Sequence, residues 1–286
     1  QVVIVLRILF VYQIRQVSLD SLYLEKNKIK LCENCFSVNP IWGAARIVGG
    51  AVTSVHEYPF AAALLRSNDL VIYTQECGGS IINILQTCVY TFACSGTISW
   101  QWRIRVGSTW ANDGGVVHNN GLLISHPNFD ARTYVHDIAI LHSLTAFVFI
   151  DITVQSVAIA STTYTLPDNT AVRAIGWGEI YSGGPTSEQL RHVEVRTVNQ
   201  AVCRERYAEL LFSVTDDMVC TGLLDVGGSD VCDQDGGGPL LYHDGQQFVV
   251  FGIYSLGYSC GHPHYPRINT RVPSYTTWIQ LPDRTL

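Results

Sequence analysis

Short β-prone runs separated by turn residues make up most of the chain. Clear examples are Trp102–Val106, Asp137–Leu141 and Gln247–Phe251, which are rich in Val, Ile, Leu and aromatic residues. Clusters of Gly, Pro, Asn and Asp fall between such runs, and many short strands with frequent turns are typical of a β-sandwich or β-barrel. The best helical pattern is Val272–Gln280, with Pro273 near its start. We therefore expect an all-β fold that ends in a helix.

The composition is typical of a compact extracellular protein. The 286 residues are enough for one large domain or two small ones, and 47% of them are hydrophobic. Nine cysteines fit an oxidising compartment, and the odd count leaves at least one thiol free or paired with another chain. The formal charge of -6 argues against nucleic acid or an anionic membrane as a partner. We expect a secreted protein.

Lysine is confined to Lys26, Lys28 and Lys30, and the chain from Ile47 onward carries Arg but no Lys. The guanidinium stays protonated at a pH where lysine loses its charge. This bias suits an alkaline fluid such as a gut lumen. Compositional drift within a gene family is the alternative.

Residues 1–46 differ from the rest and have the character of a leader or propeptide. The apolar run Val2–Tyr12 is too short to span a membrane, and Arg7 interrupts it as a signal-peptide core. A processed form, a fragment and a gene-model artefact all remain open. Cys32 and Cys35 form a lone Cys-x-x-Cys pair, which is weak evidence for a redox or zinc site.

Four landmarks follow one another in a diagnostic order. They are Arg46-Ile-Val-Gly-Gly50, Cys77-Gly-Gly-Ser80, Asp137-Ile-Ala-Ile-Leu141 and Asp235-Gly-Gly-Gly-Pro-Leu240. Together with Gly176-Trp-Gly178, they resemble the chymotrypsin and trypsin family of serine proteases, in particular the digestive trypsins of moth and butterfly larvae.

The resemblance runs from about residue 47 to residue 279. It implies a protease domain at 47–286, with two packed six-stranded antiparallel Greek-key barrels at about 47–150 and 151–271 and a helix at about 272–280. The active site of the family lies in the cleft between the barrels.

The resemblance places the aspartate of the catalytic triad at Asp137. The histidine position falls on Ala93, directly before Cys94, and the serine position falls on Gly236. His136 is a tempting substitute base, but adjacent residues of a strand point to opposite faces, so we expect it at the rim. Loss of members of such a triad lowers the rate about a million-fold.

The resemblance also assigns the specificity pocket. Asp230 stands at the base, where trypsins select Arg or Lys, and Ser255 and Gly257 line the pocket. Arg267 replaces a glycine of the pocket wall. We expect it to fill the pocket and pair with Asp230, since opposite charges about 4 Å apart attract by roughly 4 kcal/mol at an effective dielectric constant near 20. An Arg267 turned to solvent is the alternative.

Two further features of the family have matching positions here. The oxyanion hole would use the backbone N–H groups of Gln234 and Gly236. Gln234 replaces a glycine, so a positive φ there would introduce strain. Activation would cleave after Arg46 and free the Ile47 amine, which inserts beside Asp235.

Matching by motif pairs six of the cysteines and implies three disulfides, Cys77–Cys94, Cys203–Cys220 and Cys232–Cys260. Cys32, Cys35 and Cys88 are left over, and the six cysteines of an N-terminal clip module are not available. His262 and His264 flank Pro263 in what we interpret as a surface loop, not a metal site. We expect no cofactor and no metal.

Ala93 and Gly236 lead to the main functional expectation. The protein would be a secreted, catalytically inactive protease homologue that binds peptides, protease inhibitors or an active protease. The first alternative is a digestive trypsin-like endopeptidase that cleaves after Arg or Lys, with a sequence altered around residues 84–98 and at 236. The second is a non-catalytic cofactor in an immune protease cascade.

Overall fold

The computed structural model describes residues 23–25, 28–30, 50–88, 94 and 98–281, with the backbone alone at 23–25, 28–30 and 86–88. The chain divides into two compact units, Gln1–Gly43 and Ala44–Leu286. In the first unit, β1 (Tyr23–Glu25) pairs antiparallel with β2 (Lys28–Lys30).

Six strands of the second unit form a closed antiparallel barrel, in the spatial order β4-β5-β6-β9-β8-β7. Strand β7 has the alternation that gives a barrel strand an inner and an outer face. Trp102, Ile104 and Val106 are buried in the core, while Arg103 and Arg105 between them are only half-buried. The strands of this first barrel are β4 (Ala61–Arg66), β5 (Thr74–Ile81), β6 (Gln86–Cys88), β7 (Trp102–Val106), β8 (Val116–Ser125) and β9 (Ala139–Ser143).

A second sheet follows along the chain, and six of its strands, β11 to β16, are linked into a ring by their pairings. The short strands β3 (Ala51–Val52) and β10 (Ala158–Ile159) add to β12 and β15. The strands of the ring are β11 (Ala171–Gly176), β12 (Arg191–Thr197), β13 (Met218–Gly222), β14 (Pro239–His243), β15 (Phe248–Leu256) and β16 (Arg267–Arg271). The fold is therefore trypsin-like and all-β, as the sequence predicts.

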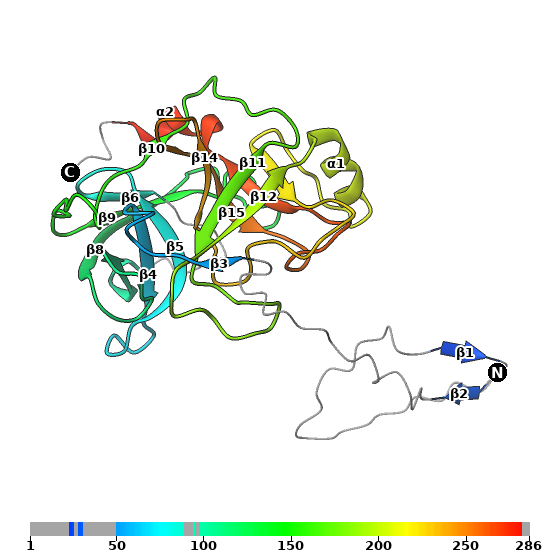
Figure 1. The fold of residues 1–286 in the computed structure, drawn as a ribbon, viewed down its shortest axis with the longest axis horizontal. Helices are drawn as coiled ribbons and strands as arrows, with labels where there is room; N and C mark the ends of the chain where they lie inside the picture. The colour runs from blue at the N-terminus through cyan, green and yellow to red at the C-terminus, as the bar shows by residue number, and fades with distance from the viewer. Residues whose placement is uncertain (1–22, 26–27, 31–49, 89–93, 95–97, 282–286) are drawn as a thin grey trace. The chain divides into compact units, whose positions relative to one another are not determined.

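The two sheets share one hydrophobic core, and they touch directly near two of the sequence landmarks. Gly78 of β5 donates a backbone hydrogen bond of 2.9 Å to the carbonyl of Gly236, which precedes β14. Figure 1 shows the first barrel in blue to green and the ring strands of the second sheet from green toward red, while the short β3 that adds to this sheet is blue. The segment that carries Gly236 thus lies against the first barrel.

The helices differ from the prediction in two ways. At the C-terminus, a 3₁₀ turn η4 (Val272–Ser274) precedes a short α2 (Thr276–Ile279), so the expected helix is interrupted at Tyr275. A second helix, α1 (Gln200–Ala208), was not predicted. Its signal was the residue before it, because the Asn199 side chain accepts hydrogen bonds from the N–H groups of Ala201 and Val202. A further 3₁₀ turn, η3 (Ser99–Gln101), leads into β7.

The structure contains the three disulfides that the family resemblance implies. Cys77–Cys94 leaves β5, Cys203–Cys220 ties α1 to β13, and Cys232–Cys260 connects the two loops that flank β14 and β15. Cys32 and Cys35 lie outside the described residues, and Cys88 is described only through the backbone of β6. Among the helices of the described residues, none has the length and apolar character needed to cross a bilayer.

Removal of one disulfide should measure how strongly α1 depends on it. We expect the double variant Cys203→Ala with Cys220→Ala to lose roughly 3 kcal/mol of unfolding free energy, because the bridge closes a loop of 17 residues. Urea denaturation followed by circular dichroism would give the value. An unchanged denaturation midpoint would show that α1 packs without help from the bridge.

Candidate active site

Asp137 is held at the junction of the two barrels. It lies two residues before the start of β9, and its exposed fraction is 3%. Ser255 of β15 donates a hydrogen bond of 2.5 Å from its Oγ to Oδ2 of Asp137, and Thr270 of β16 donates one of 2.6 Å to the Asp137 carbonyl. A residue of the first barrel is thus fixed by two strands of the second.

His136 is directed elsewhere, for a different reason from the one that the sequence suggested. Neither His136 nor Asp137 lies on a strand, because β9 begins at residue 139. His136 has a positive φ of 58°, and its ring Nδ1 lies 2.9 Å from the hydroxyl of Tyr275. Its backbone N–H donates to Asp217 at 3.2 Å. These contacts hold the ring against the C-terminal segment.

The segment around Gly236 has the backbone geometry that the family motif needs. Gln234 has a φ of +67°, so the condition under which the sequence predicts strain is met, at a cost of about 1 kcal/mol. Gln75 Nε2 donates a hydrogen bond of 3.0 Å to the Gln234 carbonyl and supports this turn. Gly236 contributes no side chain, and Ala93 lies outside the described residues.

Asp235 is completely buried behind this turn. Its Oδ1 accepts the Gly178 N–H at 2.7 Å, and its Oδ2 accepts the Cys232 N–H at 3.0 Å. Burial raises the pKa of Asp235 to about 6, and the two backbone N–H groups oppose that shift. Arg46 and Ile47, which the family resemblance assigns to activation, lie outside the described residues.

The two glycines of the Gly176-Trp-Gly178 motif make room for this carboxylate. A Cβ on Gly176 would overlap the carboxylate oxygen of Asp235. A Cβ on Gly178 would lie 2.5 Å from both the Asp233 carbonyl oxygen and Cγ of Asp235, which is too close for any real contact. The motif is therefore explained by the packing of Asp235.

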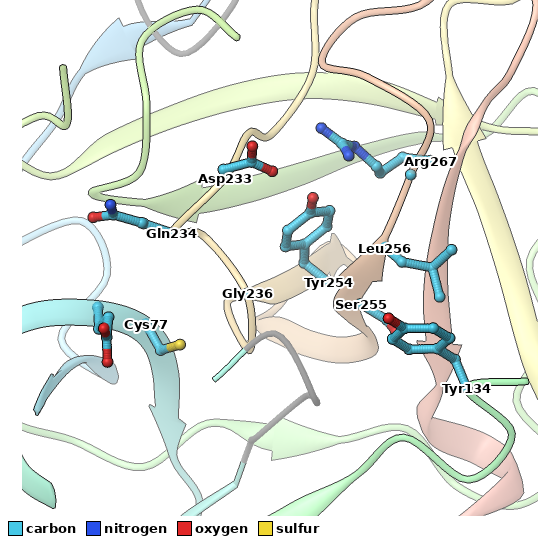
Figure 2. Close-up of a pocket in the computed structure, with 11 residues that line it drawn as sticks. Cys77, Tyr134, Asp233, Gln234, Gly236, Tyr254, Ser255, Leu256 and Arg267 are labelled. Carbon is cyan, nitrogen blue, oxygen red and sulfur yellow. The ribbon is translucent and has the colours of Figure 1, made fainter. Parts of the chain in front are cut away.

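A cavity of about 390 Å³ lies in front of these groups, and Figure 2 shows the residues around it. It is bordered by segments from both barrels, and Arg267 lies on its wall whereas Asp230 does not. The residues that line it are Glu76, Cys77, Tyr134, Asp233, Gln234, Gly236, Tyr254, Ser255, Leu256, Gly257 and Arg267.

Arg267 is buried and paired with Asp230, and their exposed fractions are 2% and 4%. Nε of Arg267 donates to Asp230 Oδ2 at 3.1 Å, and an Nη group donates to the Val231 carbonyl at 2.8 Å. The guanidinium lies 4.9 Å from the ring centre of Tyr254. Burial opposes the charge of Arg267, but Tyr254 and Asp230 outweigh it and the pKa of Arg267 lies above its ordinary value. Sequence reasoning missed Tyr254, because its position in β15 carries no family signal.

Metal binding has no support among the described residues, which contain no cluster of three or more His, Cys, Asp or Glu side chains suited to an ion. His264 lies 3.1 Å from the carboxylate of Glu209, and His262 stacks on Tyr265. These contacts account for both histidines within their own loop.

A family model named Trypsin matches residues 47–279. The chain belongs to the trypsin family. It is 48% identical to Trypsin CFT-1 of Choristoneura fumiferana and to Trypsin, alkaline A, of Manduca sexta, in each case over 82% of this chain and 90% of the relative. It is also 42% identical to Achelase-1 of Lonomia achelous, over 73% of this chain and 97% of that protein.

These relatives correct the main functional expectation. Ala93 and Gly236 led us to expect a non-catalytic homologue, and that expectation is wrong. Four lepidopteran proteins that match with 47–48% identity are named trypsins, and they align over 234 or 235 residues. A match of that length outweighs the two positions, Ala93 and Gly236, as evidence on function. The comparisons support the first alternative, a digestive trypsin-like protease.

The buried carboxylate of Asp235 should make the stability of the unprocessed chain depend on pH. Its folded pKa of about 6 lies above the ordinary value of 3.8, so the folded state binds this proton more tightly and stability falls as the pH rises from about 4 to about 6. The loss should total about 3 kcal/mol. Urea denaturation from pH 4 to 7 should give a flatter profile for Asp235→Asn. Parallel profiles would contradict the assignment.

The glycine packing can be tested with a matched pair of substitutions. Gly178→Ala should destabilise the protein by roughly 1–3 kcal/mol or more, because the new methyl group overlaps backbone and the Asp235 carboxylate. Gly79→Ala in β5 is the control, since its Cβ would meet only the Leu64 side chain at 3.5 Å. Thermal unfolding should separate the two variants. Equal melting temperatures would refute the proposed role of Gly178.

Proposed function

We propose that the protein is a secreted, digestive trypsin-like serine endopeptidase. The observation that carries this proposal is the 48% identity, over 235 residues, to lepidopteran proteins named trypsins. The Arg-only use of cations after residue 47 suits an alkaline fluid, and one of these relatives is named an alkaline trypsin. Secretion also agrees with three disulfides in the described domain.

The chemistry of the family sets a condition on this proposal. Peptide-bond cleavage of this type needs a serine hydroxyl as the nucleophile and a histidine as its base. Ala93 and Gly236 supply neither group. The proposal therefore includes that the expressed transcript encodes His before Cys94 and Ser at 236. The altered stretch would be 84–98, which contains the additional Cys88.

The rest of the site is arranged for this reaction. Asp137 is buried and oriented by Ser255, as a carboxylate that orients a histidine must be. The contact of Gly78 with Gly236 places residue 236 beside the first barrel, where residue 94 also lies: its sulfur is 3.3 Å from the Gly236 carbonyl. Residue 236 thus lies close to Cys94, the residue that directly follows the position that the family resemblance assigns to the histidine.

Activation by cleavage after Arg46 belongs to the same proposal. The Ile47 amine, once free, would provide a cation for the buried carboxylate of Asp235, whose partners among the described residues are two backbone N–H groups. A buried charge without a counter-charge is costly, so this pairing would order the turn at Gln234–Gly236. The protein would then be made as a zymogen.

Transcript sequencing and reconstruction test the proposal together. The transcript should encode His at 93 and Ser at 236. The matured double variant Ala93→His with Gly236→Ser should cleave a peptide-amide library and react with a fluorophosphonate at residue 236. Each single variant should stay orders of magnitude slower, because these residues act as a unit.

The control for this experiment is Asp137→Asn in the double-variant background. Its rate should fall about 10⁴-fold, because the histidine would lose its orienting carboxylate. A transcript with Ala and Gly at these positions, together with an inert double variant, would refute the proposed activity.

A further inference from the structure

We propose that Arg267 is a built-in occupant of the primary specificity pocket, and that the pocket consequently accepts substrate residues with small, uncharged side chains. The inference rests on the proposed endopeptidase function and names its substrate class. It concerns the cavity in front of Gly236, one wall of which is Arg267.

The first step is steric. Arg267 begins β16, and Gly257 directly follows β15 on the facing side. A Cβ built on Gly257 would overlap Cδ and an Nη atom of Arg267 and lie 2.8 Å from Nε. The guanidinium therefore extends across the pocket to the opposite wall. A long side chain that enters from the cavity would meet this arginine before it reached Asp230.

The second step is electrostatic. The carboxylate that would bind a cationic substrate side chain already accepts Nε of Arg267 at 3.1 Å and the Gly261 N–H at 2.9 Å. An incoming Lys or Arg would lose its counter-charge and meet a like charge at close range. The tethered guanidinium also competes without the entropy loss that a free ligand incurs on binding.

The third step concerns the size and the charge of the substrate side chain that the pocket can accept. The ring of Tyr254, buried to 5% exposure, stacks beneath the guanidinium and fills further space. Asp233 and Glu76 also line this cavity, and the one guanidinium on its wall, that of Arg267, is already paired with Asp230, so an acidic side chain would find no free counter-charge among the residues that line the cavity. A small, neutral side chain such as that of Gly or Ala meets neither obstacle.

Benzamidine, a compact cation, tests whether the pocket is closed. Calorimetry with the unmodified protein should detect no binding, whereas Arg267→Gly should bind benzamidine at least about tenfold more tightly than the detection limit set by the unmodified protein. The double variant Arg267→Gly with Asp230→Asn should lose this binding again, which would locate the ligand at Asp230. Arg271→Gly, at the other end of β16, is the matched control and should behave like the unmodified protein.

The accepted side chain is tested by a pair of canonical-loop protein inhibitors that differ only at the residue that enters the pocket. This probe needs no catalytic serine for binding. The unmodified protein should bind the Ala version at least about tenfold more tightly than the Lys version, and Arg267→Gly should reverse that preference. If Arg267→Gly does not fold, the preference of the unmodified protein still decides.

Benzamidine binding by the unmodified protein, or a preference for the Lys inhibitor, would overturn the inference. An inactive double variant in the cleavage assay would instead refute the endopeptidase function and leave these binding results unchanged. The two failures are thus distinguishable.

Discussion

The segment from Cys232 to Gly238 depends on one buried carboxylate. Asp235 is enclosed by Gly176 and Gly178 and accepts two backbone N–H groups, so the turn that contains Gln234 and Gly236 has a fixed anchor on its inner side. A group without exposed surface cannot relax toward water, and its cost must be met by neighbouring dipoles or a counter-charge. The positive φ of Gln234 is maintained by this anchor together with the hydrogen bond from Gln75.

The pair formed by Arg267 and Asp230 is a second buried electrostatic element, and its energetics differ from those of Asp235. Two charges of opposite sign compensate one another, yet the pair adds little net stability once desolvation is counted. Removal of one partner is much more costly, at about 3–5 kcal/mol, because the other charge stays buried alone. The pair therefore has a stronger effect on the shape and charge of the pocket than on the stability of the fold.

Much of the fold was accessible from the sequence because strands and disulfides leave local signals. The alternation in Trp102–Val106 matches β7 residue for residue, and the ordered landmarks indicated two barrels. Helix α1 was missed because its hydrophobic face is weak and its start is marked only by Asn199. The positions of His136 and Tyr254 depend on tertiary contacts with Tyr275 and Arg267, which no local pattern encodes. The burial of Arg267 could be anticipated because a glycine of the family motif was replaced opposite a charged residue.

The expectation of an inactive homologue was wrong because it depended on two residues and not on the whole domain. Ala93 and Gly236 are decisive for the chemistry of one step, but they are two positions in an alignment of 235 residues with proteins named trypsins. The family match itself covers residues 47–279, which is nearly all of the second unit. The individual site residues thus predicted an inactive protein, whereas the match over the whole domain supports a trypsin-like protease.

The closed ring of β4 to β9 has a consequence for resistance to proteolysis. Peptidases bind their substrates as extended segments, through backbone N–H and C=O groups that the substrate must present unpaired. In a closed barrel every strand has neighbours on both sides, so no edge is available for such docking. Cleavage within these strands would first require them to separate, so the resistance of the strands to digestion is a property of topology and not of the sequence at any one bond.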